Sequence, residues 1–199
     1  MRSKTEERRM QIRHVAAAAF AELGVENTTM SEIVARMGGS KATLYNYFPS
    51  KADLVQSVLA QASEIRLQQA FQALDATRPI AAMLHEFGKG YLEQLLSPEM
   101  LSAMRMAQQD GYRNDNGKRF YALGPQIGWG LMQKYLGQKL AAGVIAECDA
   151  GVASMHLKGL LQGELLDRAM LGEMNVTKRA ISLAASRAVD AFLRAYLAR

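Results

Sequence analysis

The sequence predicts an all-α protein. No stretch alternates Val, Ile, Thr and aromatic residues between turn residues, which is the pattern of a half-buried strand. Ala, Leu, Met, Gln and Arg, which favour helices, recur throughout the 199 residues, and only four prolines interrupt them. Hydrophobic residues make up 49% and charged residues 22%, which is typical of a globular chain and excludes a disordered one. We expect one large helical domain or two small ones.

The chain lacks the sequence features of membrane-spanning, secreted or disulfide-bonded proteins. No run approaches the ~18 apolar residues that a spanning helix needs. The first residues, MRSKTEERRM, lack the apolar core and cleavage site of a signal peptide. Cys148 is the only cysteine, so an internal disulfide or a Cys-rich zinc site is excluded. These observations predict a cytoplasmic protein with no membrane partner, and we expect no metal and no cofactor.

The first helix is expected at residues 4–23. Apolar residues recur there at spacings of three and four, and Gly24 ends the amphipathic stretch. The residues on this stripe are Ile12, Val15, Ala16, Ala19, Phe20 and Leu23.

Two short helices and a long one are expected next. Thr29 and Glu32 form a capping box that starts a helix, and Gly38-Gly39 ends it. Ser40 can cap the following helix at 41–48, and Pro49-Ser50 closes it. The expected inward residues of the first short helix are Ile33, Val34 and Met37. Residues 51–74 are predicted as one long helix, with inward residues Leu54, Val58, Ala62, Ile65 and Leu67.

The spacing of the two short helices predicts a helix-turn-helix at residues 29–48. A glycine turn of three residues sets the second helix across the first, so that its outer face can enter a DNA major groove. Residues 1–51 hold eight Lys/Arg against five acidic residues, a net charge of +3, whereas the other 148 residues have a net charge of +2. This concentration of positive charge favours nucleic acid as a partner, although a solvated surface would also explain it.

The rest of the chain is richer in methionine and aromatic residues and has little basic clustering. Glycine, proline and polar clusters divide it into further segments. The expected helices are 79–96, 98–109, 117–141, 149–171 and 177–198, about nine in the whole chain, with breaks at 97–98, 110–116, 143–148 and 172–175.

The stretch TTMSEIVARMGGSKATLYNYFPSKADL, residues 28–54, resembles the N-terminal DNA-binding domain of TetR-family transcriptional repressors. The resemblance extends back through AAAAFAELG at 16–24 and covers residues 4–64. The matching positions are the Thr-Thr start, Gly38, Ser40-Lys41, Thr43-Leu44-Tyr45, Tyr47-Phe48, Ser50-Lys51 and Leu54. Gly39 stands where the family usually has a valine or a similar residue under the turn, so we expect a looser turn here.

The second short helix carries groups that suit DNA. Its ammonium, hydroxyl and amide groups can bond phosphate oxygens and base edges, and the resemblance implies that Thr43, Tyr45 and Tyr47 contact phosphates or thymine methyl groups. It also implies that Lys51 holds a phosphate near a helix start, and Asn46 could bond adenine. Packing of both tyrosines in the core is the alternative. The candidate DNA-binding residues are Thr29, Ser40, Lys41, Ala42, Thr43, Tyr45, Asn46, Tyr47 and Lys51.

The second half is similar to the ligand-binding domain of the AefR-like branch of the family. The similarity lies in YLEQLLSPEMLSAMRM at 91–106, FYALGPQ at 120–126, YLGQKLAAGVI at 135–145 and LKGLLQGELL at 157–166. It implies a ligand-binding and dimerisation domain over residues 65–199, following the DNA-binding domain at 4–64.

The resemblance implies an effector pocket among the middle helices. The candidate lining residues are Phe87, Tyr91, Met104, Tyr121, Trp129, Met132, Met155 and His156. Met and aromatic residues suit an adaptable apolar cavity, and ordinary core packing is the alternative for each of them. None of the eight is Lys, Arg, Asp or Glu, so we expect a small effector that is largely apolar and uncharged or weakly charged.

The resemblance also implies a homodimer that pairs through the last two helices. Gly159 and Gly163 would permit close helix approach, and burial inside one subunit is the alternative. The apolar residues available for this interface are Leu157, Leu160, Leu161, Leu165, Ile181, Ala184, Ala188, Phe192 and Tyr196.

No catalytic motif competes with this interpretation. The segment 111–119 resembles a P-loop but has one residue too many and Arg where Ser or Thr is required. His14, His85 and His156 have no partners at metal-ligand spacing. The sequence therefore predicts a non-enzymatic repressor that binds double-stranded DNA at an inverted repeat. The alternative is an all-α small-molecule carrier or enzyme that merely retains a helix-turn-helix.

Overall fold

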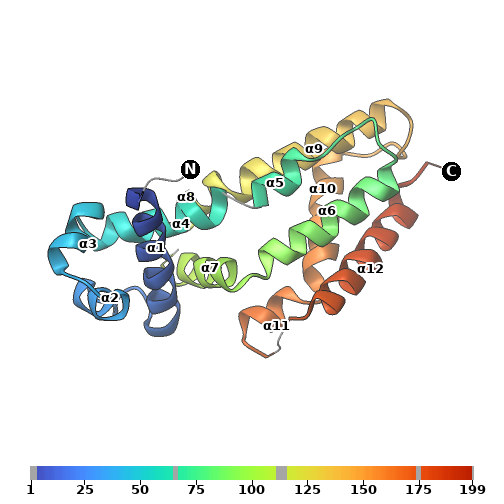
Figure 1. Ribbon diagram of the computed structural model, residues 1–199. Helices are drawn as coiled ribbons and strands as arrows, with labels where there is room; N and C mark the ends of the chain where they lie inside the picture. The colour runs from blue at the N-terminus through green and yellow to red at the C-terminus, as the bar shows by residue number, and fades with distance from the viewer. Residues whose placement is uncertain (1–3, 65–66, 111–115, 174–175, 199) are drawn as a thin grey trace. The chain divides into compact units, whose positions relative to one another are not determined.

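Helices are the only regular secondary-structure elements in the part of the chain that the structure describes. The computed structural model describes residues 4–64, 67–110, 116–173 and 176–198, and in these ranges it contains twelve helices and no strand (Figure 1). The prediction of an all-α fold is confirmed. None of the helices in the described ranges has the length and apolar character needed to cross a bilayer.

The helices form two compact units. Unit 1 comprises Met1–Glu64 and Pro98–Tyr121, and unit 2 comprises Ile65–Ser97 and Ala122–Arg199. The helices of unit 1 are α1 (Lys4–Leu23), α2 (Met30–Met37), α3 (Lys41–Tyr47), α4 (Lys51–Glu64) and α7 (Pro98–Asp110), together with most of α8 (Asn116–Leu123). The helices of unit 2 are α5 (Leu67–Gln72), α6 (Ile80–Leu95), α9 (Pro125–Ala141), α10 (Ala150–Gly163), α11 (Leu166–Met170) and α12 (Lys178–Tyr196). Helix α7 thus packs with α1 and α4, although the sequence led us to expect it in the second domain.

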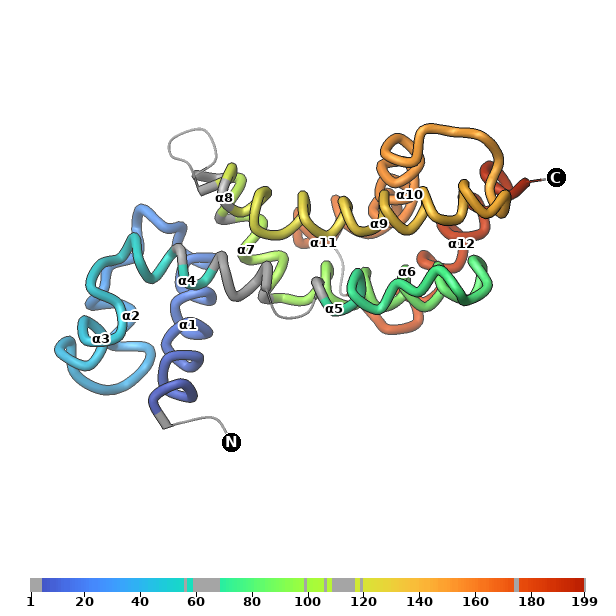
Figure 2. The backbone as a smooth tube through the Cα atoms, turned by 90° about the horizontal axis from the view of Figure 1, so that it is seen from above, coloured from blue at the N-terminus to red at the C-terminus, as the bar shows by residue number. Residues whose placement is uncertain are grey.

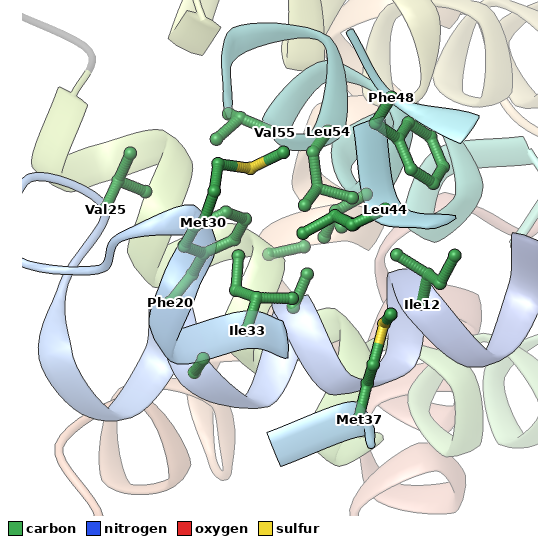
Figure 3. Close-up of a cluster of buried hydrophobic side chains, with 14 of the residues drawn as sticks. Ile12, Phe20, Val25, Met30, Ile33, Met37, Leu44, Phe48, Leu54 and Val55 are labelled. Carbon is green, nitrogen blue, oxygen red and sulfur yellow. The ribbon is translucent and has the colours of Figure 1, made fainter. Parts of the chain in front are cut away.

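Unit 1 is built around one apolar core that α1 supplies along its length. Ile12, Ala16 and Phe20 of α1 are buried at spacings of four, as the predicted stripe requires, whereas Val15 and Leu23 are only half-buried. The buried residues of α1 belong to one cluster with Ile33 of α2, Leu44 of α3 and Leu54 of α4. Figure 3 shows Ile12 and Phe20 together with these three side chains. Ala103 and Ala107 of α7 complete the same core. The core therefore holds α3 through Leu44 and Phe48, and the opposite face of α3 is exposed to solvent.

Two of the expected long helices are each divided in two. The helix expected at 149–171 consists of α10 and α11. The described parts of the helix expected at 51–74 are α4 and α5, which flank residues 65–66 outside the described ranges. The helix expected at 117–141 is interrupted at Gly124, because Pro125 starts α9 and cannot continue the hydrogen bonds of α8. Some of the sequence predictions fall outside the part of the chain that the structure describes. These are the inward side chains expected at Ala62, Ile65 and Leu67, and residues 111–115 and 174–175 in two of the expected breaks.

Unit 2 is held together by its longest helices. In unit 2, α6 packs along α12, while α10 contacts both α9 and α12. Figure 2 shows α9 and α10 joined by the loop at their shared end, in yellow and orange. Two of these helices have side-chain N-caps. The Asp149 carboxylate accepts a hydrogen bond from the Val152 amide at the start of α10 (2.9 Å), and the Thr177 hydroxyl accepts one from the Ala180 amide at the start of α12 (3.1 Å).

A buried lysine ties α9 to the loop between α5 and α6. Lys139 is 5% exposed, and its ammonium donates to the carbonyls of Ala76 (2.9 Å) and Arg78 (2.7 Å). The same ammonium lies 5.7 Å from the centre of the Tyr135 ring, a cation–π contact. Buried charge is tolerated here because carbonyl oxygens and the aromatic face replace water.

Candidate DNA-binding surface and effector site

Hydroxyl caps define the three helix starts around the candidate DNA-binding surface. Thr29 accepts the Glu32 amide at 3.1 Å, and Ser40 accepts the Thr43 amide at 3.1 Å. Ser50 accepts the Asp53 amide and donates to the Asp53 carboxylate at 2.7 Å. The cap expected at Ser40 and the Thr29 half of the expected capping box are therefore present, whereas the Glu32 carboxylate pairs with Arg36. Because α2, α3 and α4 each begin at a fixed residue, the register of α3 is defined at both ends.

Two glycines and an arginine form the turn between α2 and α3. Gly38 and Gly39 have φ angles of +65° and +129°, a region that favours glycine over residues with a side chain. The Arg8 guanidinium donates to the Gly38 carbonyl at 2.8 Å and to the Gln11 side-chain oxygen at 2.7 Å. A Cβ at Gly39 would lie 3.1 Å from the Arg8 Nη2 atom. The turn is therefore not the loose one that we expected, because Arg8 lies where a larger side chain would otherwise pack.

The outward face of α3 carries most of the candidate DNA-binding residues. Lys41, Ala42, Tyr45 and Asn46 are exposed, and Tyr45 is 46% exposed. Thr43 and Tyr47 are half-buried, and Tyr47 packs against the unit 1 core. Of the two tyrosines, only Tyr45 is thus fully presented to a partner, and Tyr47 combines packing with partial exposure. Leu44 and Phe48 are buried as predicted.

Lys51 has partners inside the chain. Its ammonium donates to the carbonyls of Val25 (2.8 Å), Glu26 (3.3 Å) and Thr28 (3.1 Å). An ammonium has three N–H donors, so all of them are used by the loop that follows α1. Lys51 therefore joins α4 to that loop here, and a phosphate would have to replace these carbonyls.

Arg36 is similarly occupied. Its guanidinium pairs with Glu22 at 2.6 Å and with Glu32 at 2.8 Å. These ion pairs lower the pKa of Glu22 and raise the pKa of Arg36. Glu22 is exposed and Glu32 half-buried, so the pairs act mainly to fix the Arg36 side chain and to neutralise the single positive charge of α2.

An aromatic cluster lies at the centre of unit 2. Phe71 of α5, Phe87 and Tyr91 of α6, and Trp129 of α9 are all buried. Their six ring-to-ring centroid distances range from 4.9 Å (Phe71 to Phe87) to 6.1 Å (Phe87 to Trp129), and most of the pairs meet edge to face. Three separate helices therefore contribute rings to one apolar site.

One polar group lies inside this aromatic cluster. The Gln162 amide of α10 donates to the Tyr91 hydroxyl at 2.6 Å, and the Trp129 ring lies 5.2 Å from the Tyr91 ring. Burial raises the pKa of the Tyr91 hydroxyl, so the phenol stays protonated near neutral pH. The cluster thus offers aromatic faces and an uncharged hydroxyl.

Comparison with known proteins assigns both units to one family. Residues 12–58 match the bacterial regulatory proteins of the tetR family, and residues 82–198, more than half of the chain, match the C-terminal domain of AefR-like transcriptional repressors. The chain belongs to the TetR family of DNA-binding transcriptional regulators. The resemblance to TetR-family DNA-binding domains is thus confirmed over residues 12–58, and the AefR-like resemblance over residues 82–198.

Individual TetR-family relatives support the same assignment. Transcriptional regulators of the helix-turn-helix type from Staphylococcus aureus are 37% identical over 65 residues, which span 33% of this chain and 35% of theirs. The match thus spans about a third of the length of these curated relatives. A TetR-family transcriptional regulator from Mesorhizobium loti superposes with a TM-score of 0.81 at 25% identity, covering 98% of this chain and 100% of that one. The flavonoid-responsive regulator FrrA superposes with a TM-score of 0.73 at 27% identity, covering 98% and 99%.

The structure brings together only part of the expected effector site of this TetR-family protein. Phe87, Tyr91, Trp129 and Met132 are buried in unit 2, the first three within the aromatic cluster. Within unit 2, Met155 and His156 do not join them, because these two residues lie on the exposed side of α10. Met104 and Tyr121 belong to unit 1, where Tyr121 is 52% exposed. Helical period explains the exposure of Met155 and His156, because α10 buries the faces of Ala153, Leu157 and Leu161 instead.

Two residues of this site were not predicted from the sequence. Phe71 carries no motif and was expected only as part of a long helix, while Gln162, like Lys158 on the same helix, was not considered at all. Lys158 lies one helical turn before Gln162 on α10 and is half-buried, which lowers its pKa. A polar residue four positions from another on an otherwise apolar helix face is the signal that could have identified both.

The last two long helices present a different surface from the one expected. Seven of the nine residues proposed for the dimer interface are buried within the protomer, because α10 and α12 pack these faces inside unit 2. The seven are Leu157, Leu161, Leu165, Ile181, Ala184, Ala188 and Phe192. Leu160 is 39% exposed, and Tyr196 is half-buried and bonds the His156 ring at 2.5 Å. The exposed apolar residues of the two helices are Val152, Met155, Leu160 and Leu183.

Proposed function

We propose that this TetR-family protein is a cytoplasmic repressor that binds an inverted-repeat operator as a homodimer and leaves it when a small aromatic ligand binds in unit 2. The outward face of α3 is the observation that carries the proposal. Lys41, Tyr45 and Asn46 are exposed there, while Leu44 and Phe48 anchor the helix in the core. A rigid helix with an exposed cation, hydroxyl and amide fits the major groove.

The proposed contacts divide into two kinds. Asn46 can bond adenine through its amide, and the Tyr45 ring can pack on a thymine methyl group, so these two residues would carry sequence preference. Lys41 and the hydroxyls of Thr29 and Ser40 would hold phosphates. The Thr29 oxygen accepts from the Glu32 amide, and its own O–H proton is free to donate to a phosphate.

The proposed dimer surface is the exposed side of α10 and α12. Val152, Met155 and Leu160 lie along the outer side of α10, with Gly159 between them. A Cβ at Gly159 or at Gly163 would meet nothing within 4 Å, so a second helix can approach the backbone closely there. These exposed residues replace the buried ones that the sequence suggested.

The proposed effector site is the aromatic cluster. Its four rings favour a flat apolar molecule, and the Tyr91 hydroxyl and Gln162 amide supply a hydrogen-bonding end. One similar structure is that of a flavonoid-responsive regulator, which supports a ligand of this kind. Because Phe71 belongs to the same cluster, a ligand that separates the rings would also shift α5.

Selection of bound duplexes from a random pool tests the DNA-binding part of the proposal. An inverted repeat should be recovered, and its affinity should fall steeply with salt. A small-molecule carrier or an enzyme would select no sequence and show no steep salt dependence, which would overturn the proposal.

A ligand screen on the selected operator tests the effector part. Neutral flat aromatic compounds should quench or shift the fluorescence of Trp129, the only tryptophan, and release the DNA. The same compounds carrying a carboxylate test whether Lys158 contributes to binding. Release by a highly charged, non-aromatic metabolite alone would show that the aromatic cluster is only core.

A further inference from the structure

The positive side chains near α3 are of two kinds. Between Thr5 and Val58 there are six Lys/Arg side chains: Arg8, Arg9, Arg13, Arg36, Lys41 and Lys51. Four have partners in the chain, because Arg8 bonds the turn, Arg13 pairs with Glu6, Arg36 pairs with two glutamates and Lys51 bonds three carbonyls. In this described stretch, Arg9 and Lys41 are the two whose charged ends have no hydrogen-bonding or ionic partner.

Arg9 lies directly against the end of α3. Its guanidinium carbon is 5.2 Å from the centre of the Phe48 ring, and Phe48 is the C-cap residue of α3. The Phe48 ring is 1% exposed, while Arg9 is exposed. A guanidinium that covers an aromatic face keeps its five N–H donors at its edge, so these donors remain available to an outside acceptor.

The two free cations are located at opposite ends of α3. Lys41 is the first residue of the helix, and Arg9 contacts Phe48, directly after the last. A seven-residue helix is about 10 Å long, and the major groove is about 12 Å wide. Cations separated by roughly the length of α3 can therefore reach the phosphates on both sides of the groove that α3 enters.

We propose that Arg9 of α1 binds a backbone phosphate of double-stranded DNA beside the end of α3, with Lys41 binding a phosphate at the other end. This inference rests on the proposed function, since it assumes that α3 enters the groove. Phe48 holds the Arg9 guanidinium in place. Binding a phosphate therefore costs Arg9 less side-chain conformational entropy than it would cost an arginine that makes no contact in the free protein. Arg8, the adjacent residue, has the different role of bracing the turn.

The salt dependence of DNA binding separates these roles. The full-length protein is titrated into a fluorescent mixed-sequence duplex at salt concentrations from about 50 to about 200 mM. Each phosphate that the protein no longer neutralises should lower the magnitude of the slope of log K against log salt by about 0.9. Arg9→Gln should lower it by about 1.8 for a dimer, so the fall in affinity across this range should shrink about tenfold, whereas Arg9→Lys should retain most of the slope.

Two matched variants serve as controls, and all variants are checked by thermal unfolding. Arg36→Gln removes a positive charge of the same unit that is already paired, and it should leave the slope unchanged. Arg8→Gln should lower the midpoint of thermal unfolding and leave the salt slope close to that of the wild type. If Arg9→Gln keeps the wild-type slope and Lys41→Gln lowers the slope, the proposed role of Arg9 is wrong and the proposed function still stands. Absence of salt-dependent duplex binding by the wild type overturns both.

Discussion

At the scale of single residues, a side chain can bind DNA only if its hydrogen-bond donors are not already used inside the protein. Lys41 and Lys51 are both lysines at the first position of a helix, yet only Lys41 has a free ammonium. The difference comes from the loop after α1, whose carbonyls converge on Lys51. A family pattern identifies both positions, but the role of each depends on its neighbours.

Lys51→Met should therefore affect stability more than DNA binding. Its removal leaves three carbonyls of the α1–α2 loop without their donor, and we expect a loss of about 1–3 kcal/mol in the free energy of unfolding. The sequence alone predicted instead that the salt slope would fall by about 1 per subunit. Thermal unfolding and a salt titration on the same variant distinguish the two expectations, with Lys41→Met as the control that should lower the slope and keep the stability.

Gly39→Val, the residue usual in the family, should destabilise this protein. At φ +129° a β-branched side chain is strained, and its Cβ would lie 3.1 Å from Arg8. We expect a loss of about 1–3 kcal/mol, measured by chemical unfolding. Adding Arg8→Ala should recover little of it, because the backbone strain remains. Wild-type stability of the single variant would show that the turn can adopt another backbone conformation.

At the scale of helices, close approach governs how the aromatic cluster is built. Phe71 packs directly on the backbone of α9 at Gly128, because a Cβ there would lie 2.5 Å from the ring. The glycine thus lets α5 contact α9 and places the Phe71 ring against Trp129, at a centroid distance of 5.3 Å. This contact therefore helps to fix the position of α5 against α9.

Two glycines of α9 provide a matched test of this contact. Gly128→Ala should destabilise the protein by about 1–3 kcal/mol, because the aromatic ring must move. Gly130→Ala lies on the same helix with nothing within 4 Å of its Cβ, and it should stabilise the protein by up to about 1 kcal/mol. Thermal unfolding measures both, and Trp129 fluorescence should change only in the first. Equal effects of the two substitutions would contradict the close approach.

At the scale of the whole molecule, the proposed DNA-binding surface and the proposed effector site belong to different units. Unit 1 holds α3 and its caps, whereas unit 2 holds the aromatic cluster and the exposed sides of α10 and α12. An inverted repeat requires two copies of α3, so the second copy must come from a partner subunit. We expect the two recognition helices of the dimer to lie about one turn of DNA, ~34 to 36 Å, or somewhat more apart.

Leu160→Arg should weaken the dimer while the protomer stays folded. Leu160 is 39% exposed on α10, so its replacement costs little inside the chain but places a charge in the proposed interface. Sedimentation at micromolar concentration should show a shift toward monomer, and affinity for an inverted repeat should fall at least tenfold. Leu171→Arg is the control, because Leu171 is 84% exposed and lies outside α10 and α12. A monomeric wild type that still binds the operator would refute the dimer surface.

The amino-acid sequence was sufficient to predict the fold class, the family and the exposure of Lys41, Tyr45 and Asn46 on α3, but not the partial burial of Thr43 and Tyr47. Apolar spacing placed Ile12, Phe20 and Leu44 in the core, and the hydroxyl caps at Thr29 and Ser40 placed the helix starts, because both signals depend on residues a few positions apart. The packing of the helices was needed to show which of these residues already have partners and which faces remain outside. The three carbonyls around Lys51, the Arg8 brace and the Phe48 ring under Arg9 each join segments more than twenty residues apart. Local sequence carries no information about such contacts, since they depend on how the helices pack.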